Sequence, residues 1–358
     1  MDKSWQVFFI YLLTHLGLIF FLYPANIISS TDEAHWIPIL LGVLFHILVV
    51  GMYLKGLSFF PGMDIIEIYT KAGMLVKVFF LLPIFAYFMM AIIISIRAYS
   101  EIITIVFLTN TPLWAIMLLL LVITCYMAIM GLETIFRTGV VIAYLFLPLI
   151  IFVMVFSFQN VDWNYLYPAW NSDFSFLKEQ EFLNSFFAIG GGYLFLGFVQ
   201  PYFSFKKMKV FLGIAIIIPC FFLSVYVPIL TYGQATASNF FFPFVMTLDA
   251  INITWLMFDR VTIFFLLSLI TFIMLFLSLV MWKTVRITHS FFPVARPSYL
   301  VIFFTCTIFL ICLFIPNWSD VEKLFSWNTF LRFYVLITVP LSLLCIGKQS
   351  KGGNKQGA

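Results

Sequence analysis

Long runs of apolar side chains, separated by short polar segments, limit what this chain can fold into. Runs of about 18 to 25 apolar residues can cross the hydrocarbon core of a bilayer as helices. Ten such runs are present, at residues 5–28, 37–54, 78–105, 112–131, 138–157, 183–204, 210–231, 260–282, 298–316 and 329–347. Only 9% of the residues are charged, whereas soluble domains carry about 25%. The sequence therefore predicts an all-α polytopic membrane protein with ten transmembrane helices.

The charges between the runs indicate how the predicted spans are oriented. With a cytoplasmic N-terminus, most lysines and arginines fall in cytoplasmic segments such as 206–209, and only Lys178 and Lys323 lie plainly in outer segments. This bias is what the positive-inside rule describes, so we expect both termini in the cytoplasm. A single transmembrane domain would cover residues 1–347, and residues 348–358 would form a basic cytoplasmic tail.

Two segments between the runs are predicted to form short helices that do not span the bilayer. Residues 62–77, GMDIIEIYTKAGMLVK, alternate isoleucine and leucine with charged residues in a helical pattern, which is typical of an amphipathic helix at the cytoplasmic interface. Residues 239–255, NFFFPFVMTLDAINITW, are apolar but contain a proline and an aspartate. They fit a short outer helix folded back over the protein.

Two predicted spans contain residues that interrupt helices. The first has Gly17 near its middle and Pro24 beyond it, and the sixth has the triplet Gly190 to Gly192. These spans open two five-helix halves, residues 5–157 and 183–347, and an odd number of spans per half inverts the second half relative to the first. Broken helices at matching positions of inverted repeats point to a transporter-like binding site. Close helix packing through glycine is the alternative.

Few ionisable residues lie inside the spans, and each is a candidate for function or for structure. His15 is two residues before Gly17, and His46 is in the middle of the second span. For both, a neutral core histidine is the alternative interpretation. Arg97 and Glu101 are four residues apart, a spacing that predicts a structural ion pair on one helix face.

No motif indicates catalysis or a cofactor. His, Cys, Asp and Glu form no cluster with catalytic or metal-ligand spacing, and the sequence has no Gly-rich phosphate loop. The net charge of +4 is too small to indicate a nucleic-acid partner. We therefore expect a protein that is not an enzyme and that holds neither a metal nor a cofactor.

The order of these features resembles the amino acid–polyamine–organocation superfamily. Within it, the chain is similar to the spore-germination permeases, the B subunits of germinant receptors in spore-forming bacteria. The resemblance is carried by GLIFFLYP (17–24), PGMDIIEIYTKAGMLVK (61–77), NYLYPAW (164–170) and FFAIGGGYLFLGF (186–198). It implies a leucine-transporter-like fold, in which ten helices form two inverted repeats with breaks in helices 1 and 6.

The resemblance also implies where a ligand would bind. In this fold the break in helix 1 presents backbone N–H groups to an amino acid carboxylate, and the carbonyls at the break in helix 6 accept from the ammonium. Apolar side chains around these ends would suit a small neutral amino acid. The implied contact residues are Gly17, Leu18, Ile19, Tyr87, Phe187, Ala188, Ile189, Gly190, Gly191, Gly192 and Tyr193.

Ion coupling has weaker signals in this sequence. In the same fold sodium would need hydroxyl groups on helix 8, and Ser268 and Thr271 could supply them. His15 is a further candidate for a polar or ion site. Hydroxyls that bond back to their own helix are the alternative for both helix 8 residues.

Two functions share this predicted site. In the first, the chain is the membrane subunit of a nutrient receptor in the spore inner membrane, and a bound amino acid acts through partner subunits. The family implies that these partners are a membrane A-type subunit and a C-type lipoprotein. In the second, the chain is a secondary amino acid transporter that uses the same site by alternating access.

Overall fold

The computed structural model describes residues 2–170, 174–190, 192–251 and 261–353, and all regular structure in these ranges is helical. The first part of the chain forms α1 (Lys3–Ile19), α2 (Tyr23–Ser30), α3 (Trp36–Leu57), α4 (Ile65–Lys71), α5 (Met74–Val106), α6 (Leu113–Met130) and α7 (Leu132–Phe156). Two 3₁₀ turns follow, η1 (Trp163–Leu166) and η2 (Ser175–Lys178). The rest forms α8 (Gln180–Gly190), α9 (Phe195–Val199), α10 (Lys207–Tyr232), α11 (Gln234–Ala237), α12 (Pro243–Asp249), α13 (Val261–Phe291), α14 (Pro297–Leu313) and α15 (Trp318–Gly353).

Most of these helices are long and apolar enough to cross a membrane. Eight segments of the described chain qualify, namely α3, α5, α6, α7, the α8–α9 range, α10, α13 and α15. A ninth is the bent pair α1 and α2 if the pair counts as one span. The predicted run 298–316 corresponds to α14, an apolar helix of 17 residues. The multi-pass helical architecture expected from the sequence is confirmed, with eight or nine spans that meet this length and composition test.

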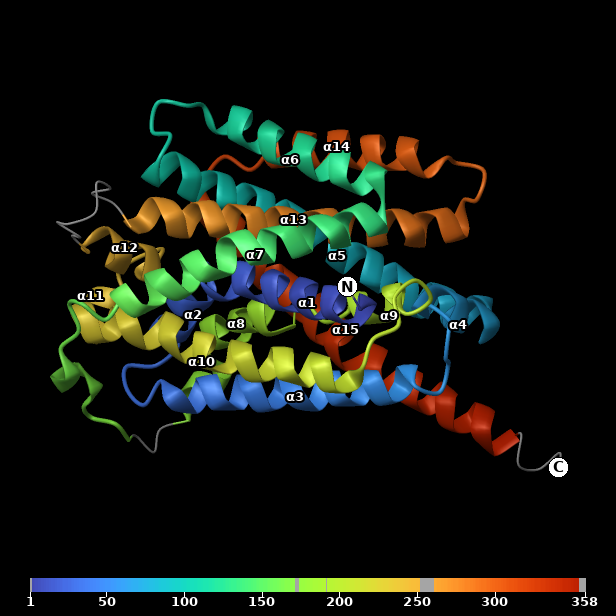
Figure 1. Ribbon diagram of the computed structural model, residues 1–358, viewed down its shortest axis with the longest axis horizontal. Helices are drawn as coiled ribbons and strands as arrows, with labels where there is room; N and C mark the ends of the chain where they lie inside the picture. The colour runs from blue at the N-terminus through green and yellow to red at the C-terminus, as the bar shows by residue number, and fades with distance from the viewer. Residues whose placement is uncertain (1, 171–173, 191, 252–260, 354–358) are drawn as a thin grey trace.

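The two interrupted spans lie inside the bundle. In the most apolar window of the α8–α9 range, 94% of the residues are buried, compared with 28% for α7. α1 packs between α7 and α10 and also contacts α13 (Figure 1), whereas α6 and α14 lie side by side at one edge of the bundle (Figure 1). Because protein surrounds the interrupted spans, their unpaired backbone groups avoid contact with lipid.

Both predicted short helices are present over part of their predicted ranges: α4 covers 65–71 of 62–77, whose last residues begin α5, and α12 covers 243–249 of 239–255, of which 252–255 lie outside the described residues. α4 begins after Asp64, whose carboxylate accepts a hydrogen bond from the backbone N–H of Glu67 at 2.8 Å and so caps the helix. Its isoleucines are buried, while Glu67 and Lys71 form an ion pair of 2.8 Å on the exposed side. α12 begins at Pro243, a residue suited to a first helical turn. Each segment is thus an amphipathic or capped helix too short to span a bilayer.

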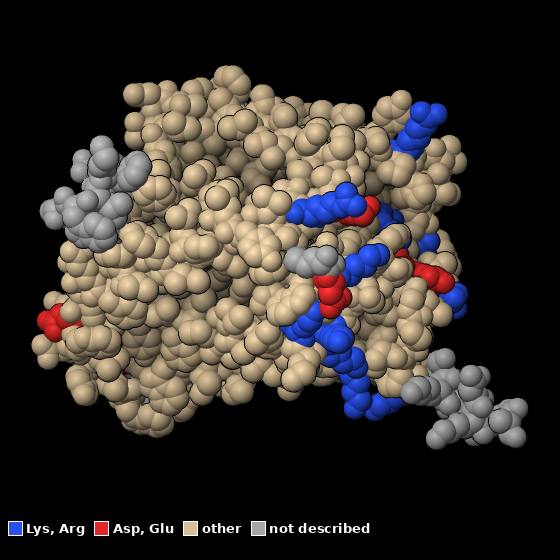
Figure 2. Space-filling model, in the orientation of Figure 1, with Lys and Arg blue, Asp and Glu red and all other residues tan. Residues whose placement is uncertain are grey.

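Basic side chains gather at one end of the bundle. On the face shown in Figure 2, lysine and arginine cluster at the end where α4, α9 and the C-terminal part of α15 lie. We call this the basic end. A concentration of basic side chains at one end of a helix bundle is what the positive-inside rule describes for the cytoplasmic side of a membrane protein.

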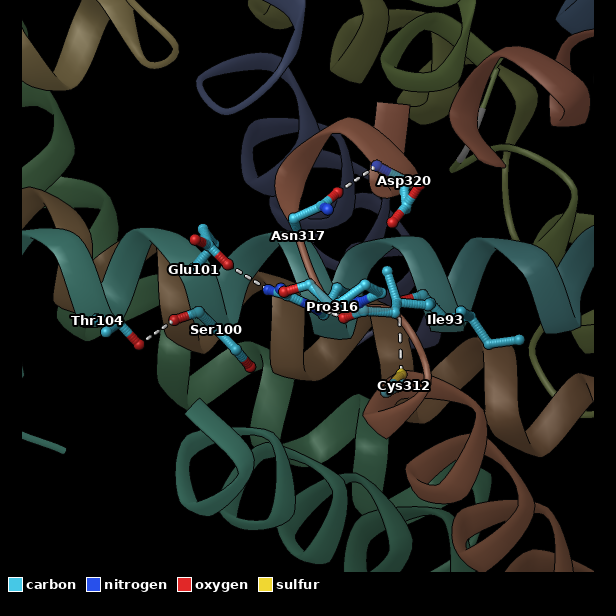
Figure 3. A network of polar contacts seen from close by, with 10 residues as sticks. Ile93, Ser100, Glu101, Thr104, Cys312, Pro316, Asn317 and Asp320 are labelled. Atoms are coloured by element: carbon cyan, nitrogen blue, oxygen red, sulfur yellow. Dashed lines mark hydrogen bonds and ion pairs between the residues drawn. The ribbon is translucent and has the colours of Figure 1, made fainter. Parts of the chain in front are cut away.

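An ion-pair network ties the connection between α14 and α15 to α5. Arg97 pairs with Glu101, as the sequence predicted, and its side chain is only 2% exposed. The Arg97 Nε–H also donates to the carbonyl of Ile315 at 3.1 Å, and the Nη2 group donates to that of Pro316 at 3.4 Å. Figure 3 shows Glu101 on α5 facing Pro316, with Cys312 beside Ile93. One buried guanidinium therefore holds two helices and a turn together.

Candidate ligand-binding site

The first span is interrupted by a turn at Phe20–Leu22, between α1 and α2, and the two helices differ in direction by 51°. Pro24 explains this position, because proline has no N–H to donate to the carbonyl four residues earlier and its ring clashes there. That carbonyl belongs to Phe20. The break expected from the sequence is present, but it follows Gly17, Leu18 and Ile19, which complete α1. The free N–H groups at the break therefore belong to the first turn of α2 and not to these three residues.

Gly17 allows α1 and α13 to approach closely. A Cβ atom at this position would lie 3.2 Å from the backbone nitrogen of Ile273 and 3.3 Å from the carbonyl carbon of Phe272. The Gly17 carbonyl also accepts a hydrogen bond from the Tyr99 hydroxyl. Gly17 is thus a packing residue at a crossing of two helix backbones, as the alternative interpretation of the glycines proposed.

Replacing Gly17 with alanine should destabilise the protein by about 1–3 kcal/mol, because two helix backbones must separate to admit the methyl group. Gly51→Ala is the matched control: this glycine lies inside α3 with nothing within 4 Å of the added Cβ, so the change should be neutral or stabilising by up to about 1 kcal/mol. Thermal unfolding of both variants in detergent measures the difference. Equal melting temperatures would rule out the close crossing.

The sixth span is interrupted after Gly190, the last residue of α8, and a turn at Gly192–Leu194 precedes α9. Unwinding was expected for Gly190 to Gly192: it is confirmed for Gly192 and wrong for Gly190, which completes α8, while Gly191 lies outside the described residues. The Tyr53 hydroxyl of α3 donates to the carbonyl of Leu194 at 2.9 Å. A side chain of the protein thus satisfies one of the carbonyls that the break leaves free.

Buried polar rings surround this turn. The His15 Nδ1 atom donates to the carbonyl of Tyr11 at 2.7 Å, so the neutral ring carries an unprotonated Nε2, which has no partner. The His46 ring lies 5.2 Å away, edge-on, and its Nε2 is 2.5 Å from the Tyr11 hydroxyl. A Cβ atom on Gly192 would come within 3.0 Å of three His15 ring atoms. The histidines of the first two spans therefore meet at the break of the sixth.

A small cavity lies between the two broken spans. Its volume is about 10 Å³, roughly the space of one water molecule. The lining residues come from the end of α1, the first-span break, the start of α2, the middle of α8 and α15: Leu18, Phe21, Leu22, Tyr23, Asn26, Asn184, Ser185, Phe187, Ala188 and Phe325. Pockets that hold small molecules measure about 300–1,000 Å³, so this conformation is closed around the candidate site.

A larger pocket of about 500 Å³ adjoins the cavity. It lies between α2, the start of α8, residues 238–241 and the start of α15, and we call it the vestibule. Leu22, Asn26, Asn184 and Phe325 line both spaces. The vestibule is therefore the approach to the cavity, and these four shared residues separate the two.

A fully buried arginine, Arg332 of α15, lies against this cavity. Its Nη1 group donates to the carbonyls of Leu183 at 3.2 Å and Asn184 at 2.9 Å, and its Nη2 group donates to that of Phe325 at 3.2 Å. Its guanidinium carbon lies 5.3 Å from the centre of the Phe187 ring and 4.8 Å from that of Phe325. A buried charge therefore lies behind two aromatic rings of the cavity, in addition to the apolar side chains that were expected around the site.

The position of Arg332 was misjudged because the last helix begins earlier than predicted. A span starting at residue 329 would put Arg332 in its first turn, at the membrane surface, but α15 starts at Trp318. Arg332 thus lies about four turns into the helix. The available signal was an ionisable residue inside an apolar run, which by itself marks a functional candidate.

Three of the predicted contact residues, Leu18, Phe187 and Ala188, line the cavity together. Others contribute to packing around it. The Ile189 side chain lies against Gly42, and the position of a Gly190 Cβ is occupied by the Leu336 side chain.

The remaining predicted residues described in the structure each carry a hydroxyl group. The Tyr193 hydroxyl donates to the carbonyl of Leu336 at 3.0 Å, and the Tyr87 hydroxyl is buried without a partner among the described residues. Ser268 and Thr271 donate to carbonyls of their own helix, at 2.7 and 2.8 Å. Their hydroxyl hydrogens are therefore already used, and an ion could bind only to the lone pairs of their oxygen atoms.

Comparison with known proteins gives one match. A family model described as "Spore germination protein" matches residues 3–321, which include both interrupted spans and the vestibule except for the part of α15 after Val321. No curated protein matches the chain.

Proposed function

The chain belongs to the family of spore germination proteins, and from this membership we propose that it is the nutrient-binding membrane subunit of a germinant receptor. The observation that carries the proposal is the closed cavity between the two broken spans, which is lined by Leu18 and Ala188 and approached through the vestibule. The first-span break at Phe21 and Leu22 borders this cavity, Asn26, Asn184 and Ser185 add polar side chains, and the other side chains are largely apolar. This combination suits a small amino acid.

The fold that we propose is the ten-helix, leucine-transporter-like arrangement. α14 serves as the ninth of ten spans, and the halves 5–157 and 183–347 form inverted repeats. The matching places of the breaks, α1–α2 in one half and α8–α9 in the other, support this arrangement. The gathering of basic side chains at one end (Figure 2) supports a cytoplasmic location for both termini.

In this proposal binding acts by shifting the chain between two conformations. The 10 Å³ cavity is too small for an amino acid, so a bound nutrient favours a conformation in which the residues between vestibule and cavity have moved apart. A ligand can shift such an equilibrium only by its difference in affinity for the two states. The change passes to an A-type membrane subunit and a C-type lipoprotein in the spore inner membrane, and no catalysis is involved.

The alternative is a secondary amino acid transporter that uses the same cavity. The interrupted spans favour it, because broken helices around a central site are what alternating access requires. For a receptor we expect the purified chain to bind at least one small neutral amino acid, proteoliposomes to show no concentrative uptake of it, and spores lacking the chain not to germinate in response to it. Concentrative uptake driven by an ion gradient would favour the transporter, and binding of no amino acid would contradict both.

A further inference from the structure

The Arg332 guanidinium is a buried cation with no anion to balance it. It is 0% exposed, and no described carboxylate forms an ion pair with it. A guanidinium has five N–H donors, and the hydrogen bonds of Arg332 go to three neutral carbonyls, while its Nε has no partner among the described residues. Removing a cation from water is costly unless a charge and a full set of hydrogen bonds compensate. The surroundings of Arg332 therefore lack an anion.

Other polar groups near Arg332 are also unsatisfied. Asn328 precedes it by one helical turn, on the same face of α15, and both its amide oxygen and its amide nitrogen are buried without a partner in the described part of the chain. The Tyr87 hydroxyl of α5 likewise has no partner there and lies within electrostatic range of the guanidinium. Buried polar groups are nearly always hydrogen-bonded. A group of three such residues indicates a space that a polar molecule enters in another conformation.

The guanidinium contacts three residues that line the cavity. It donates to the carbonyl of Asn184 and packs against the rings of Phe187 and Phe325, and all three residues line the cavity. The two rings contact each other, with centres 5.1 Å apart, and Phe325 also lines the vestibule. In the closed conformation the ring faces offer the cation a weak substitute for an anion.

We propose that Arg332 recognises the carboxylate of the molecule that binds between the broken spans. Charge-assisted bonds between a guanidinium and a carboxylate are stronger than bonds to neutral carbonyls, so the carboxylate replaces the contacts with the rings when Phe187 and Phe325 turn aside. Arg332 thus restricts the site to small molecules with a free carboxylate and rejects their amides. This inference rests on the proposed function and specifies its ligand class.

The test compares carboxylates with their neutral analogues on the full chain in detergent. Calorimetry measures the binding of the twenty L-amino acids, their α-amides, and propionate to the wild-type protein, to Arg332→Gln and to Arg332→Lys. Wild type should bind an amino acid about 10- to 100-fold more tightly than its amide, Arg332→Gln should lose that preference, and Arg332→Lys should keep part of it because the charge remains. The ratio of the two affinities is the readout, since a variant that is merely destabilised binds both probes less well.

Arg137→Gln is the matched control, because the Arg137 side chain is 72% exposed, and its ratio should equal that of wild type. An amino acid preference that survives in a folded Arg332→Gln protein overturns the role of Arg332 but leaves the proposed function standing. If Arg332→Gln does not fold, Arg332→Lys decides. An Arg332→Lys preference for the amino acid over its amide as large as that of wild type overturns the inference, and so does equal binding of amino acid and amide by wild type. Arg332-dependent binding of propionate without binding of any amino acid supports the inference and contradicts the amino acid receptor. Binding of no carboxylate contradicts both.

Discussion

Gly192→Ala is expected to weaken amino acid binding at least 10-fold and to destabilise the protein by about 1–3 kcal/mol. The added methyl group would lie within 3.0 Å of the His15 ring atoms Cε1, Nδ1 and Nε2. That ring is 0% exposed, is held by its bond to the Tyr11 carbonyl, and has the His46 ring beside it. Either the ring or the turn between α8 and α9 must move, and both changes alter the geometry between the two breaks. Calorimetry and thermal unfolding measure the two effects.

A double-variant experiment separates this clash from a general loss of stability. His15→Ala removes the ring, so the Gly192→Ala/His15→Ala protein should be more stable than the sum of the two single changes predicts, by about 1 kcal/mol or more. Additive effects would show that the two residues do not meet. Gly51→Ala, which places a methyl group in open space, serves as the control for adding a Cβ atom to a glycine.

Arg97→Gln is expected to lower the free energy of unfolding by about 3–5 kcal/mol, because it breaks a buried ion pair and leaves one charged partner behind. The change also removes bonds to the carbonyls of Ile315 and Pro316, which hold the α14–α15 connection against α5. Unfolding in denaturant with the detergent held constant measures the loss.

The chain contains a matched control for this change. Arg137 and Glu133 form an ion pair with the same spacing, but both side chains are 72% exposed, so Arg137→Gln should cost no more than about 1 kcal/mol. The double replacement Arg97→Met/Glu101→Leu should recover much of the lost stability, because it leaves no unpaired charge. Equal costs for Arg97→Gln and Arg137→Gln would contradict the buried network.

The sequence predicted which spans are interrupted but not the residues at which they are interrupted. Pro24 was correctly associated with an interruption, yet Gly17 was taken as its start because both residues disfavour helices. In the structure Gly17 continues α1, because its missing side chain is used for contact with Phe272 and Ile273. The sequence cannot distinguish a glycine that breaks a helix from one that lets two helices pack closely, because the difference lies in which residues of another helix face the glycine.

The candidate site shows the same limit. Phe187 and Ala188 were found because they lie close to the glycine triplet, whereas the predicted span 329–347 gave no indication that Arg332 lies well inside a longer helix. Its partner Asn184 is 148 residues away. No local pattern relates two positions at such a separation, and the burial of Arg332 depends on how α8 packs against α15.

The sequence by itself determined that this chain is a bundle of apolar helices, that two of them are interrupted, and which segments carry the basic charges. These properties depend on the composition of short segments, because burying unpaired polar groups in a bilayer is costly and only apolar helical segments can cross it. Three features became visible only in the folded molecule: the first-span break faces α8 across a closed cavity, His15 lies against Gly192, and a buried guanidinium stands behind the rings of Phe187 and Phe325. The reason is that each of these contacts joins residues distant in the chain, and side-chain packing alone selects which of them come together.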